Sequence, residues 1–443
     1  MIILLKRASL LLLLAAIALG TASLARAQAI SPSKDEISYR VKPGDSLIAL
    51  GTRYFLTADS YKIVAQANSL ENANRLRVGS TITIPISVLK FTRFDARIIA
   101  YKGHASVSRN GRAEAVTLQT RLSEGQVIET GEDGYLTMQL ANGSKISIPS
   151  NSRFRISRMR TYLLTGGVDL DFMVERGRSE TTAARLKDSR SRFRIRTPVA
   201  VSAVRGTVFR IGYDGPDAPS LTEVVEGNVA MNLTATGAQT AIPGGFGAAG
   251  RTDGKLNREE LLPPPTFTPG MDLQRQTNVV FALQPSAGAV GYQVQVAKDQ
   301  AFTDVVVGAR SDRPQIDLGP LPGGQYYVRA MAIAPSGLIG MPRTEPFVRR
   351  LQLLVSRQFS ANQKDWQLNW DLGGPADASY RVQVFDAARP DVPIIDEPAL
   401  PDRSLTITGL PPGNYTWRVG LKRPIDGNLQ QSWTPFEGFT LGN

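Results

Sequence analysis

The sequence predicts a mainly β protein of several domains: a small strand–helix–helix–strand unit, a β-rich module and two related β-sandwich repeats. Its 443 residues exceed what one hydrophobic core usually supports. The chain has 40 Gly and 28 Pro, with 42% apolar and 20% charged residues, which is typical of folded, turn-rich structure. From Arg97 onward, alternating apolar and polar residues recur between turn signals and favour strands.

Residue counts exclude several kinds of chemistry. The chain has no Cys and a single His, His104, which excludes a Cys nucleophile, a disulfide framework and a Cys-containing zinc site. A site with two imidazoles is excluded as well. Only carboxylate chemistry, Ser/Lys chemistry or no catalysis remains open. We expect no metal and no cofactor.

The first residues predict export. Two basic residues precede an apolar run over residues 8–19, and the Ala-Arg-Ala of residues 25–27 has small side chains where a signal peptidase cleaves. We interpret residues 1–27 as a signal peptide, with an uncleaved N-terminal anchor as the alternative. No later stretch approaches the roughly 18 apolar residues needed to cross a bilayer. We therefore expect a periplasmic or secreted mature chain without a transmembrane segment.

The positive charge of the mature chain is concentrated in one region. Without the signal peptide the chain has 48 basic and 39 acidic residues, a net charge of +9. Residues 151–210 alone hold 14 Lys and Arg against five Asp and Glu, which is also +9. Nucleic acid is disfavoured as the partner of this region by export and by the absence of interleaved exposed aromatic residues.

Residues 37–88 form the predicted α/β unit. Short alternating segments at 39–41 and 81–85 predict strands, and apolar residues at helical spacing predict helices from about residue 47 and over 61–68. The motifs Tyr-x-Val-Lys-Pro-Gly-Asp-Ser-Leu, Ala-Asn-Ser-Leu and Leu-x-Val-Gly-x-x-Ile-x-Ile-Pro occur here in this order. Together they closely resemble the LysM domain across essentially the whole unit.

This resemblance implies binding to glycans that contain N-acetylglucosamine, chiefly peptidoglycan, in a groove between the loop after the first strand and the loop before the second. An acetamido group offers a donor, an acceptor and a methyl, which loop backbone and an apolar side chain such as Leu47 or Leu70 can satisfy. The resemblance places these glycan-binding residues in the two loops: Gly44, Asp45, Ser46, Leu47, Asn68, Ser69, Leu70 and Arg77. Alternatively, Asp45 only caps a helix and Asn68 only ends one.

Residues 95–250 form the predicted β-rich module. Asn-Gly pairs at 110–111 and 142–143 lie between alternating segments and predict hairpins, the second with a type I′ turn. The motifs Gly-Gln-x-Ile-x-Thr-Gly, Asn-Gly-Ser, Val-Arg-Gly-Thr-x-Phe and Val-x-Glu-Gly-x-Val follow one another and resemble the FecR domain over residues 97–235. FecR-type regulators cross the inner membrane and signal to a sigma factor, whereas residues 1–27 of this sequence are interpreted as a signal peptide, so we do not expect direct control of a sigma factor. The resemblance therefore implies an exported β module for an unidentified ligand or envelope protein.

Arginines alternate with core residues in two strands of this module. At period two they share one face of the sheet, while Phe and Ile fill the other. The predicted basic face consists of Arg153, Arg155, Arg192, Arg194 and Arg196. This face could bind an anionic polymer through bidentate guanidinium contacts. The favoured alternative is a solvated face, or internal pairing with Asp169, Asp171 and Glu175.

Residues 251–270 are predicted to be a linker, because Pro263, Pro264 and Pro265 remove three consecutive N–H donors. Residues 271–350 and 351–443 then repeat one pattern. Tyr-Gln-Val-Gln-Val and Leu-Pro-Gly-Gly-Gln-Tyr in the first match Tyr-Arg-Val-Gln-Val and Leu-Pro-Pro-Gly-Asn-Tyr in the second. Both repeats resemble the fibronectin type III sandwich, in which the corner Tyr bonds backbone across a turn.

A wall hydrolase would need two carboxylates across a cleft. The nearest pairs are Asp169 with Asp171 and Glu223 with Glu226, and His104 lacks a recognisable nucleophile motif. We therefore predict a non-catalytic exported cell-envelope protein that binds peptidoglycan through its LysM-like domain and presents its other modules to a partner. A periplasmic signal-sensing or regulatory protein and a peptidoglycan hydrolase of unrecognised type are the alternatives.

Overall fold

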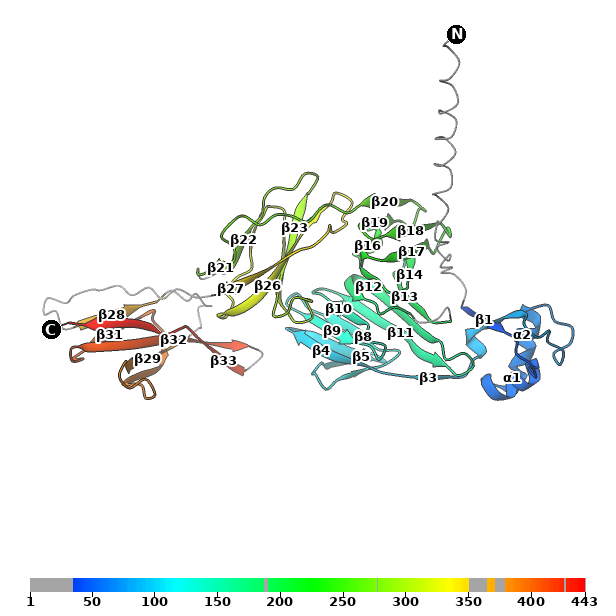
Figure 1. Cartoon of the computed structure of the whole chain (residues 1–443), viewed down its shortest axis with the longest axis horizontal. Coiled ribbons are helices and arrows are strands. Elements are labelled where there is room, and N and C mark those ends of the chain that lie inside the picture. Colours follow the sequence, from blue (N-terminus) through cyan, green and yellow to red (C-terminus); the bar gives the residue numbers. More distant parts are fainter. Residues whose placement is uncertain are drawn as a thin grey trace, which may run out of the picture. The chain divides into compact units, whose positions relative to one another are not determined.

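The computed structural model describes residues 35–186, 190–276, 278–349, 365–370, 379–425 and 428–442 (Figure 1). All of them fall within the unit Pro32–Asn443. The signal peptide expected at residues 1–27 lies outside the described residues. Most of the regular structure is strand, which confirms the predicted mainly β fold class.

The first module has the predicted order of strand, helix, helix and strand. Its elements are β1 (Glu36–Arg40), α1 (Leu47–Tyr54), the 3-10 turn η1 (Ala58–Ser60), α2 (Tyr61–Ala67), β2 (Thr81–Pro85) and the 3-10 turn η2 (Ile86–Val88). β1 and β2 pair antiparallel, and both helices lie beside this pair (Figure 1). α1 begins after Ser46, whose hydroxyl accepts a hydrogen bond from Ala49 N–H, and it buries Leu47 in the same core as Val64 of α2.

The β-rich module is one closed network of hydrogen-bonded strands. Its strands are β3 (Phe91–Arg93), β4 (Ala96–Lys102), β5 (Ala105–Arg109), β6 (Arg112–Ala115), β7 (Arg121–Leu122), β8 (Val127–Thr130), β9 (Tyr135–Gln139), β10 (Lys145–Ile148), β11 (Arg153–Tyr162), β12 (Val168–Thr182), β13 (Arg192–Arg196), β14 (Ala200–Val204), β15 (Val208–Tyr213), β16 (Ser220–Glu226), β17 (Asn228–Leu233), β18 (Gln239–Pro243), β19 (Phe246–Gly250) and β20 (Leu256–Glu260). The long strand β12 links two sheets. Its first part pairs with β11 and β13, and its last part pairs with β10 and β15.

Aromatic side chains from four strands form the centre of this module's core. Phe154 on β11, Phe172 on β12, Phe193 on β13 and Phe209 on β15 make successive ring contacts with centroid distances of 5.6, 5.7 and 6.5 Å. All four are fully buried. Because side chains alternate along a strand, the residues between these aromatics point to the opposite face of the sheet.

The hairpin between β9 and β10 is confirmed, but its turn is not type I′. Only Gly143 has a positive φ in this turn, at 87°, whereas type I′ needs two such residues. Asn110 and Gly111, at 52° and 82°, meet that requirement in the turn between β5 and β6. Gly143 N–H donates to Leu140 O at 3.0 Å, and Leu140 N–H donates to Ser144 O at 2.9 Å. This is the pattern of a longer loop built on a type I turn followed by a left-handed glycine.

The predicted linker over 251–270 is too wide, because both of its ends belong to the neighbouring modules. β20 pairs with β19, and Phe267 packs against the core of the first sandwich. Between them, Leu262 O accepts a hydrogen bond from Met341 N–H at 2.8 Å. The residues of β20 are mostly polar and do not alternate between apolar and polar, so the sequence pattern did not predict this strand.

The first sandwich pairs a larger sheet with a smaller one. The larger sheet has the order β21, β27, β26, β23, β24, and the smaller consists of β22 and β25. The strands are β21 (Leu273–Gln274), β22 (Val280–Ala282), β23 (Gly291–Ala297), β24 (Val305–Ser311), β25 (Gln315–Asp317), β26 (Gly324–Ile333) and β27 (Arg343–Arg349). Side chains from both sheets share one core, which includes Phe281, Val294 and Phe347.

The second sandwich repeats this plan. Its strands are β28 (Asp365–Asn369), β29 (Ser379–Asp386), β30 (Ile395–Leu400), β31 (Ser404–Thr408), β32 (Gly413–Ile425), β33 (Asn428–Trp433) and β34 (Glu437–Leu441). The predicted tyrosine corners are confirmed: Tyr326 OH donates to Pro322 O at 3.2 Å, and Tyr415 OH donates to Pro411 O at 2.7 Å. The repeated sequence motif therefore encodes the same backbone corner twice.

Candidate functional site

The two predicted glycan-binding loops lie side by side in the first module. Leu47 N–H donates to Ala73 O at 2.8 Å, which joins the start of α1 to the loop that follows α2. Gly44, with φ 86°, and Ser69, with φ 52°, have left-handed backbone in these loops, and both are exposed. The fold thus brings together the two chain segments that the sequence predicted as the site.

Asp45 holds the first loop to its own strand. Its carboxylate accepts hydrogen bonds from Tyr39 OH at 2.8 Å and from Lys42 N–H at 2.7 Å. Burial and the bond to Asp45 raise the pKa of Tyr39 to about 12. Ser46, and not Asp45, caps α1. The structure therefore gives the Asp45 side chain a loop-closing role.

Asn68 joins α2 to β2. Its side-chain N–H groups donate to Val64 O at 2.8 Å and to Thr83 O at 2.6 Å, and its side-chain oxygen accepts from Thr83 N–H at 2.7 Å. These three hydrogen bonds occupy both the nitrogen and the oxygen of the Asn68 side-chain amide. The expectation that Asn68 contacts sugar through its side chain does not agree with this geometry, because the amide is already committed to the fold.

The two leucines predicted to contact the sugar are less accessible than the sequence suggested. Leu47 is fully buried in the core of the module, and Leu70 is half-buried against the same core, so Leu47 cannot offer a surface to a sugar. The Ser46 hydroxyl caps α1, which leaves Gly44, Ser69 and Arg77 as the exposed members of the predicted set.

Two exposed apolar residues beside these loops escaped the sequence analysis. Ile48 is 40% exposed and directly follows Leu47, and Val78 is 57% exposed and directly follows Arg77. The helical spacing could have identified Ile48, because it falls off the face of α1 that carries Leu47 and Leu50. Nothing in the loop sequence distinguishes Val78 from a core residue.

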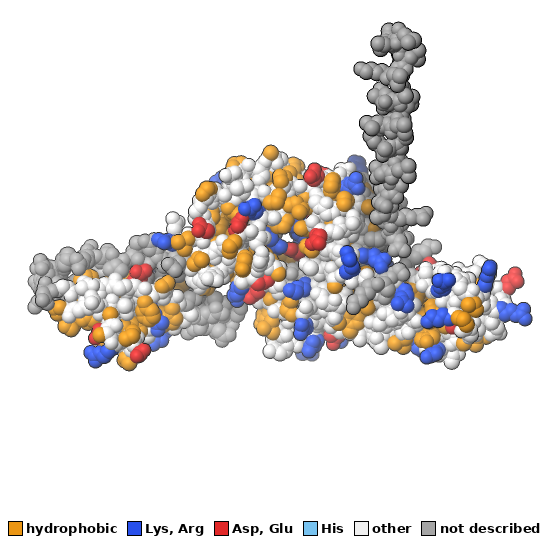
Figure 2. Space-filling model, viewed as in Figure 1, with side chains coloured by type: hydrophobic (Ala, Val, Ile, Leu, Met, Phe, Trp, Pro, Cys, Tyr) orange, Lys and Arg blue, Asp and Glu red, His pale blue; other side chains and the backbone are white. Residues whose placement is uncertain are grey.

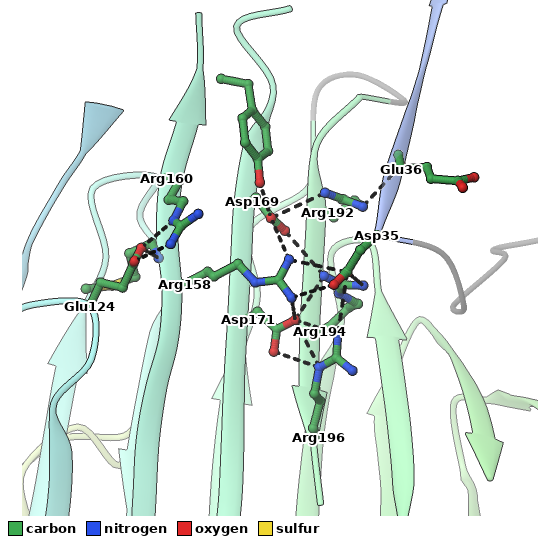
Figure 3. Close-up of polar contacts among 12 residues, drawn as sticks. Asp35, Glu36, Glu124, Arg158, Arg160, Asp169, Asp171, Arg192, Arg194 and Arg196 are labelled. Atoms are coloured by element: carbon green, nitrogen blue, oxygen red, sulfur yellow. Dashed lines mark hydrogen bonds and ion pairs between the residues drawn. The ribbon is translucent and has the colours of Figure 1, made fainter. Parts of the chain in front are cut away.

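The arginines of β13 lie opposite the aspartates of β12. The two strands run parallel in a register that places Asp169 opposite Arg192 and Asp171 opposite Arg194 (Figure 3). Asp171 accepts from Arg196 Nε at 2.8 Å and pairs with Arg194 Nη2 at 2.9 Å. Both aspartates are fully buried.

Arg158 and Asp35 complete this arginine–aspartate cluster, which we define as Asp35, Arg158, Asp169, Asp171, Arg192, Arg194 and Arg196. Arg158 Nη2 lies 2.9 Å from Asp35, and Arg194 Nη1 lies 3.1 Å from it. Arg192 Nη1 donates to Glu36 O at 3.2 Å, and Glu36 is the first residue of β1 (Figure 3). The cluster therefore connects the start of the first module to three strands of the β-rich module.

The other two arginines of the predicted basic face are paired as well. Arg153 and Arg155 each bond Glu175, at 2.6 and 2.5 Å, and Arg153 also bonds Glu129. On the face drawn in Figure 2, Lys and Arg side chains lie among acidic, polar and apolar ones. The five arginines are therefore engaged with carboxylates of the same module, and Arg194 is buried.

The carboxylates considered for hydrolysis are also held by arginines. Glu223 is fully buried, with Arg178 Nη1 at 2.8 Å and Arg210 Nε at 3.4 Å, and it accepts from Ile339 N–H at 3.1 Å. Glu226 is exposed at the end of β16. Glycosidase carboxylates must approach a sugar from both sides of a cleft, and neither Glu223 nor the Asp169–Asp171 pair is placed to do so.

His104 is exposed and lies 2.9 Å from the carboxylate of Asp133 through its Nδ1. The hydrogen bond from His104 lowers the pKa of Asp133. Among the described residues, no group of three or more His, Asp or Glu side chains is placed to hold a metal ion. Within the same residues, no helix is long and apolar enough to cross a membrane.

Comparison with family models supports the predicted order of modules. Residues 39–85 match the LysM domain, and residues 126–230 match the FecR protein family. The predicted succession of a LysM domain and a FecR domain is thereby confirmed. Both families are typically binding or regulatory modules and typical of envelope-associated proteins.

Solved structures with partial likeness include a protein assigned as an anti-sigma factor from Parabacteroides distasonis. It is 15% identical with a TM-score of 0.26, over 30% of this chain and 59% of that one. The FN1–FN3 domains of chicken CNTN1 are 12% identical with a TM-score of 0.18, over 55% of this chain and 95% of that one. No curated protein matches the chain in sequence.

Proposed function

We propose that this chain, with its LysM domain followed by a FecR domain, is a non-catalytic exported protein of the cell envelope. It binds peptidoglycan through residues 37–88 and presents the FecR-like module and the two sandwiches to an envelope protein. The observation that carries the proposal is the LysM match over 39–85, together with the two loops that the Leu47–Ala73 backbone bond holds together.

The structure supports a division of labour among the residues of the loops. Gly44, Ser69 and Arg77 are exposed and contact the glycan, with Ser46 and Leu70 at the edge of the groove. Asp45, Leu47 and Asn68 hold the loops in shape from behind. Ile48 and Val78 supply the apolar surface for the methyl of an acetamido group, which the buried Leu47 cannot.

Retention on purified sacculi tests this assignment. The Ile48→Ser/Val78→Ser variant is expected to lose about tenfold in affinity, since two apolar contacts are removed. Leu56→Ser is the matched control, because Leu56 is 54% exposed and follows the other end of α1. Equal retention of wild-type protein and the double variant would remove Ile48 and Val78 from the site, and a wild-type chain that is not retained would refute glycan binding.

Point variants are preferable to deletion of the whole domain. Tyr162 of β11 is buried in the core of the first module, and Arg158 and Arg194 pair with Asp35. Deleting residues 37–88 would expose Tyr162 and so disturb the β-rich module. For the non-catalytic part of the proposal, sacculi incubated with the protein are expected to release no muropeptides.

A regulatory role is the second candidate function. It is favoured by the FecR match and by the arginine–aspartate cluster, which ties the segment before β1 to β11, β12 and β13. Such a connection would let the FecR-like module respond when the LysM domain is bound. Hydrogen exchange in β13, measured with and without chitin oligomers, tests this candidate, and unchanged exchange in that strand would argue against it.

A further inference from the structure

The two sandwiches carry the same arginine–glutamine pair on the face of the larger sheet that points away from the core. In the first sandwich, Arg329 of β26 lies opposite Gln295 of β23, and its Nε and Nη2 donate to the Gln295 side-chain oxygen at 3.2 and 2.6 Å. In the second, Arg418 of β32 lies opposite Gln383 of β29, and the same two atoms donate to the Gln383 side-chain oxygen at 2.9 and 2.6 Å. The repeated sequence therefore builds the same pair twice.

Each of these arginines also lies over an aromatic ring. The guanidinium carbon of Arg329 is 4.3 Å from the centre of the Phe302 ring, and that of Arg418 is 4.3 Å from the centre of the Trp433 ring. A second ring, Phe436, has its centre 4.8 Å from Arg418. Stacking on the face of a ring leaves the N–H groups at the edge of the guanidinium available for hydrogen bonds. The glutamine and the ring therefore hold each guanidinium in place and leave its Nη1 for a further acceptor.

In the first sandwich, this arginine binds a carboxylate of another module. Arg329 Nη1 and Nη2 donate to the two carboxylate oxygens of Glu180 on β12, each at 2.7 Å. The contact lies in the interface with the β-rich module, where Arg329 is only 7% exposed. Bidentate pairing with a carboxylate is among the strongest contacts that a guanidinium makes. The first sandwich thus shows which ligand the arginine–glutamine pair accepts.

In the second sandwich, none of the described residues supplies that carboxylate. Within the described part of the chain, Arg418 forms no ion pair, and its side-chain bonds go to Gln383 alone. Asp396 lies on the same face but is held by Arg381, whose Nε and Nη2 bond its two oxygens at 2.7 and 2.6 Å. Arg418 is half-buried, and Phe436 beside it is 51% exposed. An arginine among accessible aromatic rings is typical of protein interfaces.

We infer that this face of the second sandwich docks a protein domain that presents an aspartate or glutamate side chain from its surface. The partner's carboxylate takes the place at Arg418 that Glu180 takes at Arg329. Apolar side chains around that carboxylate cover Phe436 and Trp433. The inference rests on the proposed function, in which the sandwiches are presented to an envelope protein, and it names the chemistry of the contact on that protein.

Zero-length coupling tests the inference, because a carbodiimide joins a lysine amine only to a carboxylate that it contacts. The full-length Arg418→Lys variant is produced in the organism that makes the protein, and its envelopes are treated with the carbodiimide. Mass spectrometry is expected to find the new lysine joined to an Asp or Glu of another envelope protein. Arg329→Lys is the positive control and is expected to couple to Glu180. Arg313→Lys, at an exposed arginine of the first sandwich, is the matched control and is expected to couple to no other protein. The partner identified in this way is expected to co-purify about tenfold less with Arg418→Gln than with wild-type protein.

Absence of a coupled product in Arg418→Lys would overturn the inference, and so would coupling to Asp396 or to a second copy of this chain. Failure of Arg329→Lys to couple to Glu180 would overturn it too, because the contact on which it is based would be absent. Equal co-purification of the identified partner with Arg418→Gln and wild-type protein would show that Arg418 is not the docking point. Retention of the same variants on sacculi is expected to be unchanged, since it depends on the first module. Normal retention without a coupled product would therefore overturn this inference and leave glycan binding standing.

Discussion

Asp171 and Arg194 face each other across the parallel β12–β13 pair, with 2.9 Å between Oδ2 and Nη2. Both side chains are buried on the face of the sheet opposite the aromatic core. The alternation that fills the core with Phe193 and Ile195 therefore also creates a row of arginines, and β12 supplies the carboxylates that neutralise it.

Removal of one carboxylate from this row is expected to be costly. Asp171→Ala leaves Arg194 buried without its closest partner, and we expect it to lower the free energy of unfolding by about 3 to 5 kcal/mol. Glu114→Ala is the control, because Glu114 is an exposed residue with a long ion pair to Arg112. Urea denaturation of both variants measures the difference. Similar stability of the two would show that the row is not needed for the fold.

The sequence predicted the arginine row and gave internal pairing with Asp169, Asp171 and Glu175 as one alternative, but it did not decide between that pairing and a solvated face. Period-two alternation in Arg-Phe-Arg-Ile-Arg places the arginines on one face whatever the neighbouring strand is. Their pairing depends on the parallel register with Asp169 and Asp171, each of which lies 23 residues before the arginine opposite it. No local pattern determines such a register.

In the first module, the order of elements and the loops that meet were predictable, because caps, helical spacing and turn residues are local signals. The roles of individual side chains were not. Asn68 lies in the predicted loop, yet its amide bonds to Thr83, fifteen residues away. Leu47 directly follows the first predicted loop in the sequence, but its side chain is buried in the core. Both roles are set by packing between distant segments.

Asn68→Ala is expected to destabilise the first module. It leaves Thr83 N–H and Thr83 O without their partner, at a cost of about 3 kcal/mol. Gln66→Ala, at an exposed position of α2, is the control. Thermal unfolding of both variants, monitored by circular dichroism, measures the difference in their stability. A fully stable Asn68→Ala variant would show that the bonds between Asn68 and Thr83 are not needed for the fold.

The contact at Asp35 is expected to weaken in acid. Burial acts to raise the pKa of the Asp35 carboxyl, but hydrogen bonds and charge from Arg158 and Arg194 outweigh it and lower the pKa from 3.8 to about 2. Because the folded-state pKa is below the unfolded one, this contribution is complete above about pH 4 and is lost as the pH falls towards 2. Asp35 is half exposed, so solvent screening reduces the contribution to about 1 kcal/mol.

Asp35→Asn tests this pH dependence. The variant is expected to be less stable than wild-type protein at pH 6, and the difference should disappear near pH 2. Asp59→Asn, at an exposed residue of the same module, should show no such trend. A stability difference that stays constant from pH 6 to pH 2 would mean that the Asp35 carboxylate does not act through its charge.

The contact between Glu180 and Arg329 is expected to hold the first sandwich against the β-rich module. Arg329 is buried, makes two 2.7 Å bonds to Glu180 and lies 4.3 Å from the centre of the Phe302 ring. Glu180→Ala leaves this cation without its carboxylate and should lower the free energy of unfolding by about 3 to 5 kcal/mol. The matched control is Glu345→Ala, since Glu345 pairs with Arg343 at the surface. Limited proteolysis between residues 261 and 270 should become faster in Glu180→Ala but not in Glu345→Ala, because separation of the modules exposes that connection. Equal cleavage of both variants would show that other contacts are enough to hold the two modules together.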